Sequence, residues 1–160
     1  KMEIMTLEEI SMLASSDYEL NEVLQSVVEK TAKRLGVDVS SIYLWDGKEL
    51  VLRATTSFVK EAIGKVRLKL GEGVTGTAAK EGKPIYVKDV SKDRRYKKFS
   101  ELREQNYTSM LSHPIIHKGE LFGVLNVQTV APKEFQEDEI YFVSVIANML
   151  LGAIRIRKKV

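Results

Sequence analysis

One short run, residues 70–76, constrains the fold of this chain more than any other feature, because its three glycines suit two incompatible structures. By spacing it reads Gly-x-Gly-x-x-Gly, typical of the turn that binds a dinucleotide between a buried parallel strand and a long helix. Residues 66–70 instead alternate apolar and charged side chains, which indicates a half-exposed strand. Pro84 stops the helix predicted over residues 77–81 early. These neighbours favour another fold, and the dinucleotide site stays an alternative, with Asp89 as its ribose-binding acid.

Two tight turns predict that the sheet is antiparallel. Asp46 and Gly47 form one of the strongest short hairpin signals, and Gly119 lies in a second turn between two apolar-rich runs. Strands joined by such turns run in opposite directions. The predicted strands cover residues 39–45, 49–56, 66–70, 85–87, 108–116 and 121–130.

Helices are predicted at both ends of the chain. Apolar residues recur at helical spacing over residues 2–15 and again in the segment that Gly36 ends. Ser16 and Asp17 are predicted to cap the start of that second helix. A last helix is predicted over residues 137–158. Because these helices must cover one face of an antiparallel sheet, we expect an α+β fold.

Composition narrows the class of protein. The chain has 160 residues, 44% of them hydrophobic, which suits one compact domain. It has no cysteine, which excludes disulfides, thiol nucleophiles and thiolate metal sites, and we expect a reducing, cytoplasmic location. We find no apolar run long enough to span a bilayer and no secretory signal, so we expect no membrane contact.

A long connection over residues 88–107 lacks clear periodicity, and such connections inside compact domains are usually functional or disordered. Residues 88–103 hold seven basic and three acidic side chains, with the aromatic residues Tyr96 and Phe99 among them. Proteins that bind single-stranded nucleic acid show such interleaving. Because the net charge is only +3, we instead expect a solvated lid over one face of the sheet and no nucleic-acid partner.

In their order and spacing, several motifs resemble a GAF domain, and together they span essentially the whole chain. The matching runs are residues 41–46, 70–76, 112–115, 121–125 and 135–139. Two longer runs, residues 66–73 and 112–117, are most similar to the GAF domain of nitrogen-type phosphoenolpyruvate-protein phosphotransferases.

The resemblance implies a central antiparallel sheet of about six strands. Terminal helices would cover one face, and short helices with a lid loop would lie over a pocket on the other, as in GAF and PAS domains. Such domains sense small molecules or dimerise, and they pass their state to an attached effector domain. We therefore expect residues 1–160 to form a single GAF domain from a larger multidomain signalling protein.

The chemistries known in this family narrow the function further. Bilin-binding members and the free methionine sulfoxide reductases of this fold need cysteines, which this chain lacks. Members that bind cyclic nucleotides carry Asn-Lys after the fifth strand, where this chain has Thr129 and Val130. The second part of their motif is matched by residues 135–139, but this match is one residue too short. We expect no cofactor, no cyclic nucleotide and no enzymatic activity. A parent transferase would act through a separate domain.

Strand alternation and the resemblance together predict a ligand site. Alternation leaves Ser41 and Tyr43 of one strand, and Asn126 and Gln128 of another, on the pocket face. The predicted ligand-binding residues are Ser41, Tyr43, Phe58, Val74, Thr75, Tyr96, Phe99, Thr108 and Asn126. The alternative is a pocket that the domain's own side chains fill.

No catalytic or metal site is predicted. His113 and His117 lie about 13 Å apart along a strand, too far to hold one metal ion. We expect His113 to be a strand residue with a satisfied ring. Ser112 beside it lacks an orienting acid at a readable spacing. The acids at residues 137–139 open a helix, where the macrodipole favours negative charge.

We therefore expect a regulatory sensor domain that binds an unknown small molecule, forms a homodimer through its terminal helices, or both. Ile140, Tyr141, Met149 and Ile156 surround more of the last helix than one sheet face buries, which motivates the dimer. The alternatives are a purely structural dimerisation module without a ligand and a nucleotide-binding enzyme domain.

Overall fold

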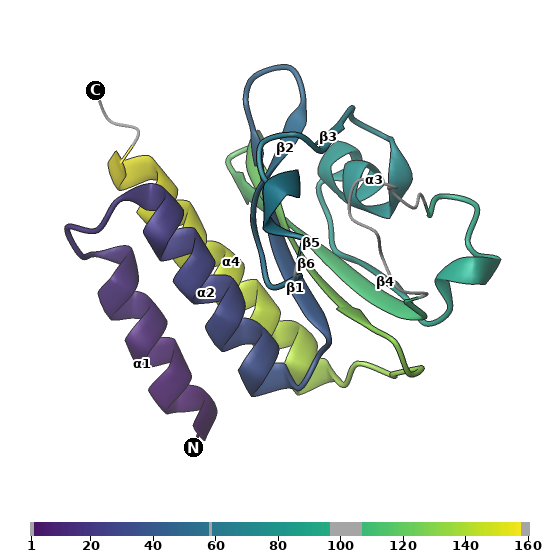
Figure 1. Ribbon diagram of the computed structural model, residues 1–160, viewed down its shortest axis with the longest axis horizontal. Coiled ribbons are helices and arrows are strands. Elements are labelled where there is room, and N and C mark those ends of the chain that lie inside the picture. Colours follow the sequence, from purple (N-terminus) through teal and green to yellow (C-terminus); the bar gives the residue numbers. More distant parts are fainter. Residues whose placement is uncertain (1, 58, 97–106, 158–160) are drawn as a thin grey trace.

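Helices cover both faces of a single sheet in the computed structural model shown in Figure 1. The structure describes residues 2–57, 59–96 and 107–157, and of residues 2–5 it describes the backbone only. The helices are α1 (Met2–Ala14), α2 (Leu20–Leu35), α3 (Gly73–Glu81) and α4 (Glu137–Arg157), with short 3-10 helices η1 (Lys60–Ala62) and η2 (Val90–Lys92). The strands are β1 (Val39–Trp45), β2 (Leu50–Thr55), β3 (Arg67–Leu68), β4 (Ile85–Val87), β5 (Ser109–His117) and β6 (Glu120–Thr129).

The six strands form one sheet in the order β3-β2-β1-β6-β5-β4, and each neighbouring pair is antiparallel. This arrangement confirms the predicted α+β fold. A dinucleotide site needs a helix that connects two parallel strands. The described sheet has no parallel pair, so the glycine run does not serve such a site.

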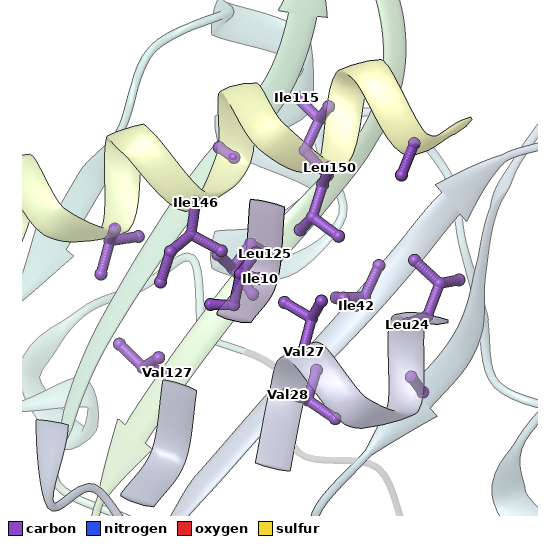
Figure 2. Packing of buried hydrophobic residues seen from close by; sticks show 14 of the residues in the cluster. Ile10, Leu24, Val27, Val28, Ile42, Ile115, Leu125, Val127, Ile146 and Leu150 are labelled. Carbon is purple, nitrogen blue, oxygen red and sulfur yellow. The ribbon is translucent and has the colours of Figure 1, made fainter. Parts of the chain in front are cut away.

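The terminal helices lie on one face of the sheet, as predicted: α2 and α4 pack on the strands, and α1 packs against both of them (Figure 1). Figure 2 shows the core that they form with the sheet, where Ile10, Val27, Ile42, Leu125 and Ile146 converge from five different elements. All five are fully buried. Burying one such side chain stabilises the fold by about 1.5–3 kcal/mol, so this layer is the main source of stability.

The start of α2 differs from the prediction. Ser16 and Asp17 do not cap it, since α2 begins at Leu20 and the backbone N–H of Glu19 donates to the side chain of Glu22 at 3.3 Å. Ser16 instead serves the end of the preceding helix, because its hydroxyl donates to the carbonyl oxygen of Leu13 at 2.7 Å. A serine that can close one helix or open the next is ambiguous in the sequence.

Helix α4 corrects the prediction about membrane spans. By length and composition alone, this one helix of the described chain is long and apolar enough to cross a membrane. Its apolar character has another cause here. Seven of its residues, Phe142, Val143, Ile146, Ala147, Leu150, Ala153 and Ile154, are buried in the domain.

Helix α3 begins at Gly73, four residues earlier than predicted, and packs over β5 and β6 on the other face of the sheet. Gly71 and Gly73 have φ angles of +83° and +70°, a conformation that favours glycine. At Gly76 a Cβ would lie 2.6 Å from the carbonyl oxygen of Lys69. Backbone conformation and close packing therefore account for all three glycines, without a phosphate.

Candidate functional site

A cavity lined by residues of β1, β6 and α3 lies on the face of the sheet opposite to the terminal helices. Its volume is about 30 Å³. A space of this size holds a water molecule or a group of a few atoms. The described residues that line it are Val39, Ser41, Tyr43, Thr55, Ser57, Leu68, Gly73, Val74, Thr75, Tyr96, Tyr107, Met110, Asn126 and Gln128.

Most of the predicted ligand-binding residues meet at this cavity. Those that line it are Ser41, Tyr43, Val74, Thr75, Tyr96 and Asn126. Phe58 and Phe99 lie outside the described residues. The structure does not bring Thr108 to the cavity: it lines a separate surface depression with Tyr86, and its neighbour Tyr107 takes the position on the cavity wall. That these residues bind a ligand stays a prediction.

Strand alternation assigned the two faces of the sheet correctly. The register pairs Ser41 with Asn126 and Ile42 with Leu125. Ser41 and Asn126 line the cavity, whereas Ile42 and Leu125 belong to the core under the terminal helices. A shift of one residue in either strand would have exchanged these roles.

Asn126 connects three elements around the cavity. Its side-chain oxygen accepts a hydrogen bond from the Ser112 hydroxyl of β5 at 2.6 Å, and its nitrogen donates to the Thr75 hydroxyl of α3 at 2.7 Å. All three residues are buried. Because breaking this chain would leave buried polar groups unpaired, it holds the start of α3 over the sheet.

A second hydrogen-bonded pair lies on the opposite wall. The hydroxyls of Ser41 and Thr55 are 2.9 Å apart, and the Thr55 hydroxyl also accepts from the backbone N–H of Ser57 at 3.1 Å. The backbone of Thr55 is bound in turn by the side chain of Gln25 on α2. The cavity wall is thereby connected to the helix layer on the other face.

No charged side chain lies on the described part of the cavity wall. Arg95, next to Tyr96, forms a two-point contact with Asp93, with nitrogen–oxygen distances of 2.6 and 2.9 Å. This contact raises the pKa of the Arg95 guanidinium and lowers the pKa of the Asp93 carboxyl. The charge of Arg95 is therefore balanced by the carboxylate of Asp93. Lys97 and Lys98 of the same basic segment lie outside the described residues.

His113 has the role predicted for it. Its Nδ1 lies 2.9 Å from the carbonyl oxygen of Pro114, and burial lowers the pKa of the ring. Its partner in the sheet register is Leu125, a residue of the core under the terminal helices. His113 is therefore a strand residue with a satisfied ring nitrogen.

Several residues on the cavity wall were not among the predicted ligand contacts. They are Val39, Thr55, Ser57, Leu68, Gly73, Tyr107, Met110 and Gln128. Extending the two-residue alternation would have found Val39, two positions before Ser41, and Met110, two before Ser112. Alternation would not have found Thr55. The register between β1 and β2 shifts between Ile42 and Tyr43, so side chains of β2 do not alternate regularly between the two faces across this point.

Comparison with known proteins identifies the family to which this chain belongs. The family model described as GAF domain matches residues 19–154. The chain belongs to the GAF family. A solved structure of the GAF domain from a phosphoenolpyruvate-protein phosphotransferase of Coxiella burnetii is 32% identical, with a TM-score of 0.89 over 96% of this chain and 93% of that one. The predicted resemblance to phosphotransferase GAF domains is thereby confirmed.

Two further relatives share less of their sequence with this GAF domain. A Nif-specific regulatory protein of Azospirillum brasilense is 26% identical over 167 residues, and the match covers 99% of this chain but only 27% of that protein. The chain thus spans about a quarter of the length of this relative. A free methionine-R-sulfoxide reductase of Neisseria meningitidis is 20% identical, with a TM-score of 0.80 over 96% of this chain and 89% of that one. At this identity the likeness is one of fold.

Proposed function

We propose that this GAF domain is a regulatory sensor that binds a small molecule in the cavity under α3 and controls an effector domain attached to it. The observation that carries the proposal is the convergence of polar side chains from β1, β6 and α3 on a space with partly apolar walls. The similarity to a Nif-specific regulatory protein supports a regulatory role.

The proposed role is not enzymatic, and we propose that the domain works in the cytoplasm without binding nucleic acid or a membrane. Acid–base chemistry needs titratable groups with perturbed pKa values at the site. The described cavity wall carries no carboxylate, histidine or lysine, and the chain has no cysteine. These features support binding rather than catalysis.

We further propose that the domain is a homodimer through its terminal helices. Tyr141 and Ile156 of α4 are 71% and 59% exposed, and Met12 of α1 is 71% exposed. Tyr141 and Ile156 are separated by about four helical turns, so they lie on the same side of α4. Exposed large apolar side chains on both terminal helices support an interaction surface there.

A ligand screen tests the sensor proposal. Amino acids, 2-oxo acids and nucleotides would be added to the purified chain, and the thermal unfolding midpoint measured. A ligand at a hundred times its Kd stabilises the native state by about 2.7 kcal/mol, which shifts the midpoint measurably. The variant Thr75→Val keeps the shape of the cavity wall without its hydroxyl, so it should reduce the shift. No shift with any compound, and no retained ligand in native mass spectrometry, would contradict sensing.

Sedimentation velocity tests the dimer. Tyr141→Lys places a charge on the exposed side of α4 and should convert dimer to monomer. Leu70→Lys is the matched control, because Leu70 is also an exposed apolar residue but lies before α3, away from the terminal helices. A monomeric chain at high concentration, or equal effects of the two variants, would contradict the proposal.

The volume of the cavity favours a second candidate, a purely structural dimerisation module. A space of about 30 Å³ does not admit a molecule of amino-acid size unless the wall moves. This candidate predicts a dimer with no thermal shift from any compound. The two experiments together therefore separate it from the sensor.

A further inference from the structure

Gln128 of β6 differs from the other polar side chains of the cavity wall. The side chains of Ser41, Thr55, Thr75 and Asn126 pair with one another or with neighbours. The carboxamide of Gln128 has no hydrogen-bond partner in the described parts of the chain, although the residue is only 7% exposed and lines the cavity. The amide is not among the fully buried side-chain atoms that lack a partner, which are the hydroxyl oxygens of Thr31 and Ser40, so it stays accessible to a molecule from outside the described residues.

The backbone of Gln128 fixes the direction of its side chain. The residue pairs with Val39 of β1 and with Met110 of β5, and its carbonyl oxygen accepts from the N–H of Asp38 at 3.0 Å. Turning the side chain away from the cavity would break this central ladder. Val39 and Met110 are both buried and apolar, so neither neighbour can pair with the amide. Because the amide stays accessible, a ligand group from outside the chain can pair with it where these neighbours cannot.

We propose that Gln128 is the specificity-determining residue of the cavity and that it selects an uncharged ligand group with a hydrogen-bond donor beside an acceptor, as in a carboxamide. This inference rests on the proposed sensor function. A glutamine side chain carries an acceptor oxygen and an N–H donor on one edge. A group with the complementary edge forms two parallel hydrogen bonds with it.

The charge and the size of the cavity both limit which ligand group can bind there. A carboxylate or ammonium group would be buried without an opposite charge, because the described wall carries no ionised side chain. The start of α3, at Gly73, also lines the cavity and would favour an anion there, so the two influences compete. A cavity of about 30 Å³ admits a group as small as a carboxamide.

Three small probes of nearly the same shape separate these chemistries: acetamide, acetone and acetate. Each would be titrated into the ¹⁵N-labelled 160-residue chain while the side-chain NH₂ signal of Gln128 is followed by NMR. Acetamide should shift this signal and saturate. Acetone, which accepts but does not donate, should bind at least about tenfold more weakly. Acetone or acetate binding as tightly as acetamide, or no shift with acetamide, would overturn the inference.

Variants at neighbouring positions separate recognition from a structural role. Gln128→Leu keeps the volume and removes the amide, so acetamide binding, followed through the Thr75 signal, should weaken at least about tenfold. Its unfolding midpoint should stay equal or rise, because no hydrogen bond between the amide and a described residue is lost. Val130→Leu is the control, because Val130 lies two residues further along the chain and does not line the cavity, so it should retain acetamide binding. A lowered midpoint for Gln128→Leu, or unchanged binding, would show that the amide does not select the ligand.

The outcomes also separate this inference from the sensor proposal. If a compound from the ligand screen binds the cavity and Gln128→Leu does not weaken it, the inference fails and the sensor proposal stands. If acetamide shifts the Gln128 signal but no compound stabilises the chain, the specificity of the amide stands and the sensor proposal fails.

Discussion

The side chain of Gln25 on α2 binds both backbone polar groups of Thr55 on β2. Its nitrogen donates to the Thr55 carbonyl oxygen at 3.0 Å, and its oxygen accepts from the Thr55 N–H at 3.4 Å. The hydroxyl of Thr55 lies 2.9 Å from that of Ser41 on the cavity wall. Two hydrogen-bonded steps therefore connect the cavity to the helix that packs beside α4.

The first prediction concerns this contact. Gln25→Ala should lower the free energy of unfolding by about 1 kcal/mol, because the part-buried N–H of Thr55 loses its acceptor. The carbonyl oxygen keeps a donor in Lys60. Urea unfolding measures the change. Glu29→Ala is the control, since Glu29 contacts the same amide at 3.1 Å on the exposed side. Equal effects of the two variants would mean that the Thr55 contact adds nothing.

The second prediction concerns Arg157, whose guanidinium connects the end of α4 to the end of α1 and the residues after it. It donates to the carbonyl oxygens of Ala14 at 2.8 Å, Ser16 at 2.7 Å and Tyr18 at 2.9 Å, all at or after the end of α1, and to that of Ala153 in its own helix at 3.1 Å. Removing it in Arg157→Ala should weaken the docking of α1 on α4. Hydrogen exchange in α1 should then become at least about tenfold faster, while the sheet stays protected.

Arg157→Lys is the informative companion to this variant. Lysine keeps the charge but lacks the planar fork that reaches several carbonyl oxygens at once. We expect α1 exchange in Arg157→Lys to lie close to that of Arg157→Ala. Wild-type exchange in the lysine variant would instead show that charge alone holds α1.

Local patterns determined most of the fold, and these were readable in the sequence. Strands β1 and β4 lie at the predicted residues, because alternation of side chains and the flanking turns are properties of neighbouring residues. Helix α3 was harder, since its first turn includes Gly73, and glycine gives no helical signal of its own. The close approach of Gly76 to the backbone of Lys69, which leaves no room for a Cβ, is visible only in the structure.

The sequence predicted several residues of the cavity wall, but it did not predict the volume of the cavity or the hydrogen bonds among its polar groups. Alternation placed Ser41 and Asn126 on the right face. The volume of the cavity and the pairing of its polar groups depend on side-chain packing between elements far apart in the chain, such as the contact between Thr75 and Asn126. For the same reason, only the structure could reveal that the amide of Gln128 has no partner among the described residues.

The third prediction concerns two glycines whose replacement by alanine should change the free energy of unfolding in opposite directions. A Cβ at Gly123 of β6 would lie 2.3 Å from the carbonyl oxygen of Tyr43 on the neighbouring strand. Gly123→Ala should therefore reduce the free energy of unfolding by about 3 kcal/mol. At Gly152, in the exposed middle of α4, a Cβ would meet nothing within 4 Å. Gly152→Ala should raise stability by about 1 kcal/mol.

Thermal and urea unfolding of both alanine variants check this pair. Because the substitution is chemically the same, the contrast isolates the surroundings of each glycine. Destabilisation at Gly152 would reveal a close contact on the exposed side of α4, such as the surface of a second copy. A neutral result at Gly123 would contradict the tight approach of β6 to β1.

The pH dependence of stability gives the last prediction. Burial lowers the pKa of His113 below its ordinary value of 6.5. The unfolded chain therefore binds a proton at a higher pH than the folded chain, so the contribution is fully present above pH 6.5 and is lost as the pH falls through the folded-state value. His113→Asn should flatten the loss of unfolding free energy between about pH 7.5 and about pH 5. Asp93→Asn should act only at lower pH, because contact with Arg95 lowers the carboxyl pKa from 3.8. Equal slopes in wild type and His113→Asn would show that the pKa of the ring is the same in the folded and the unfolded chain.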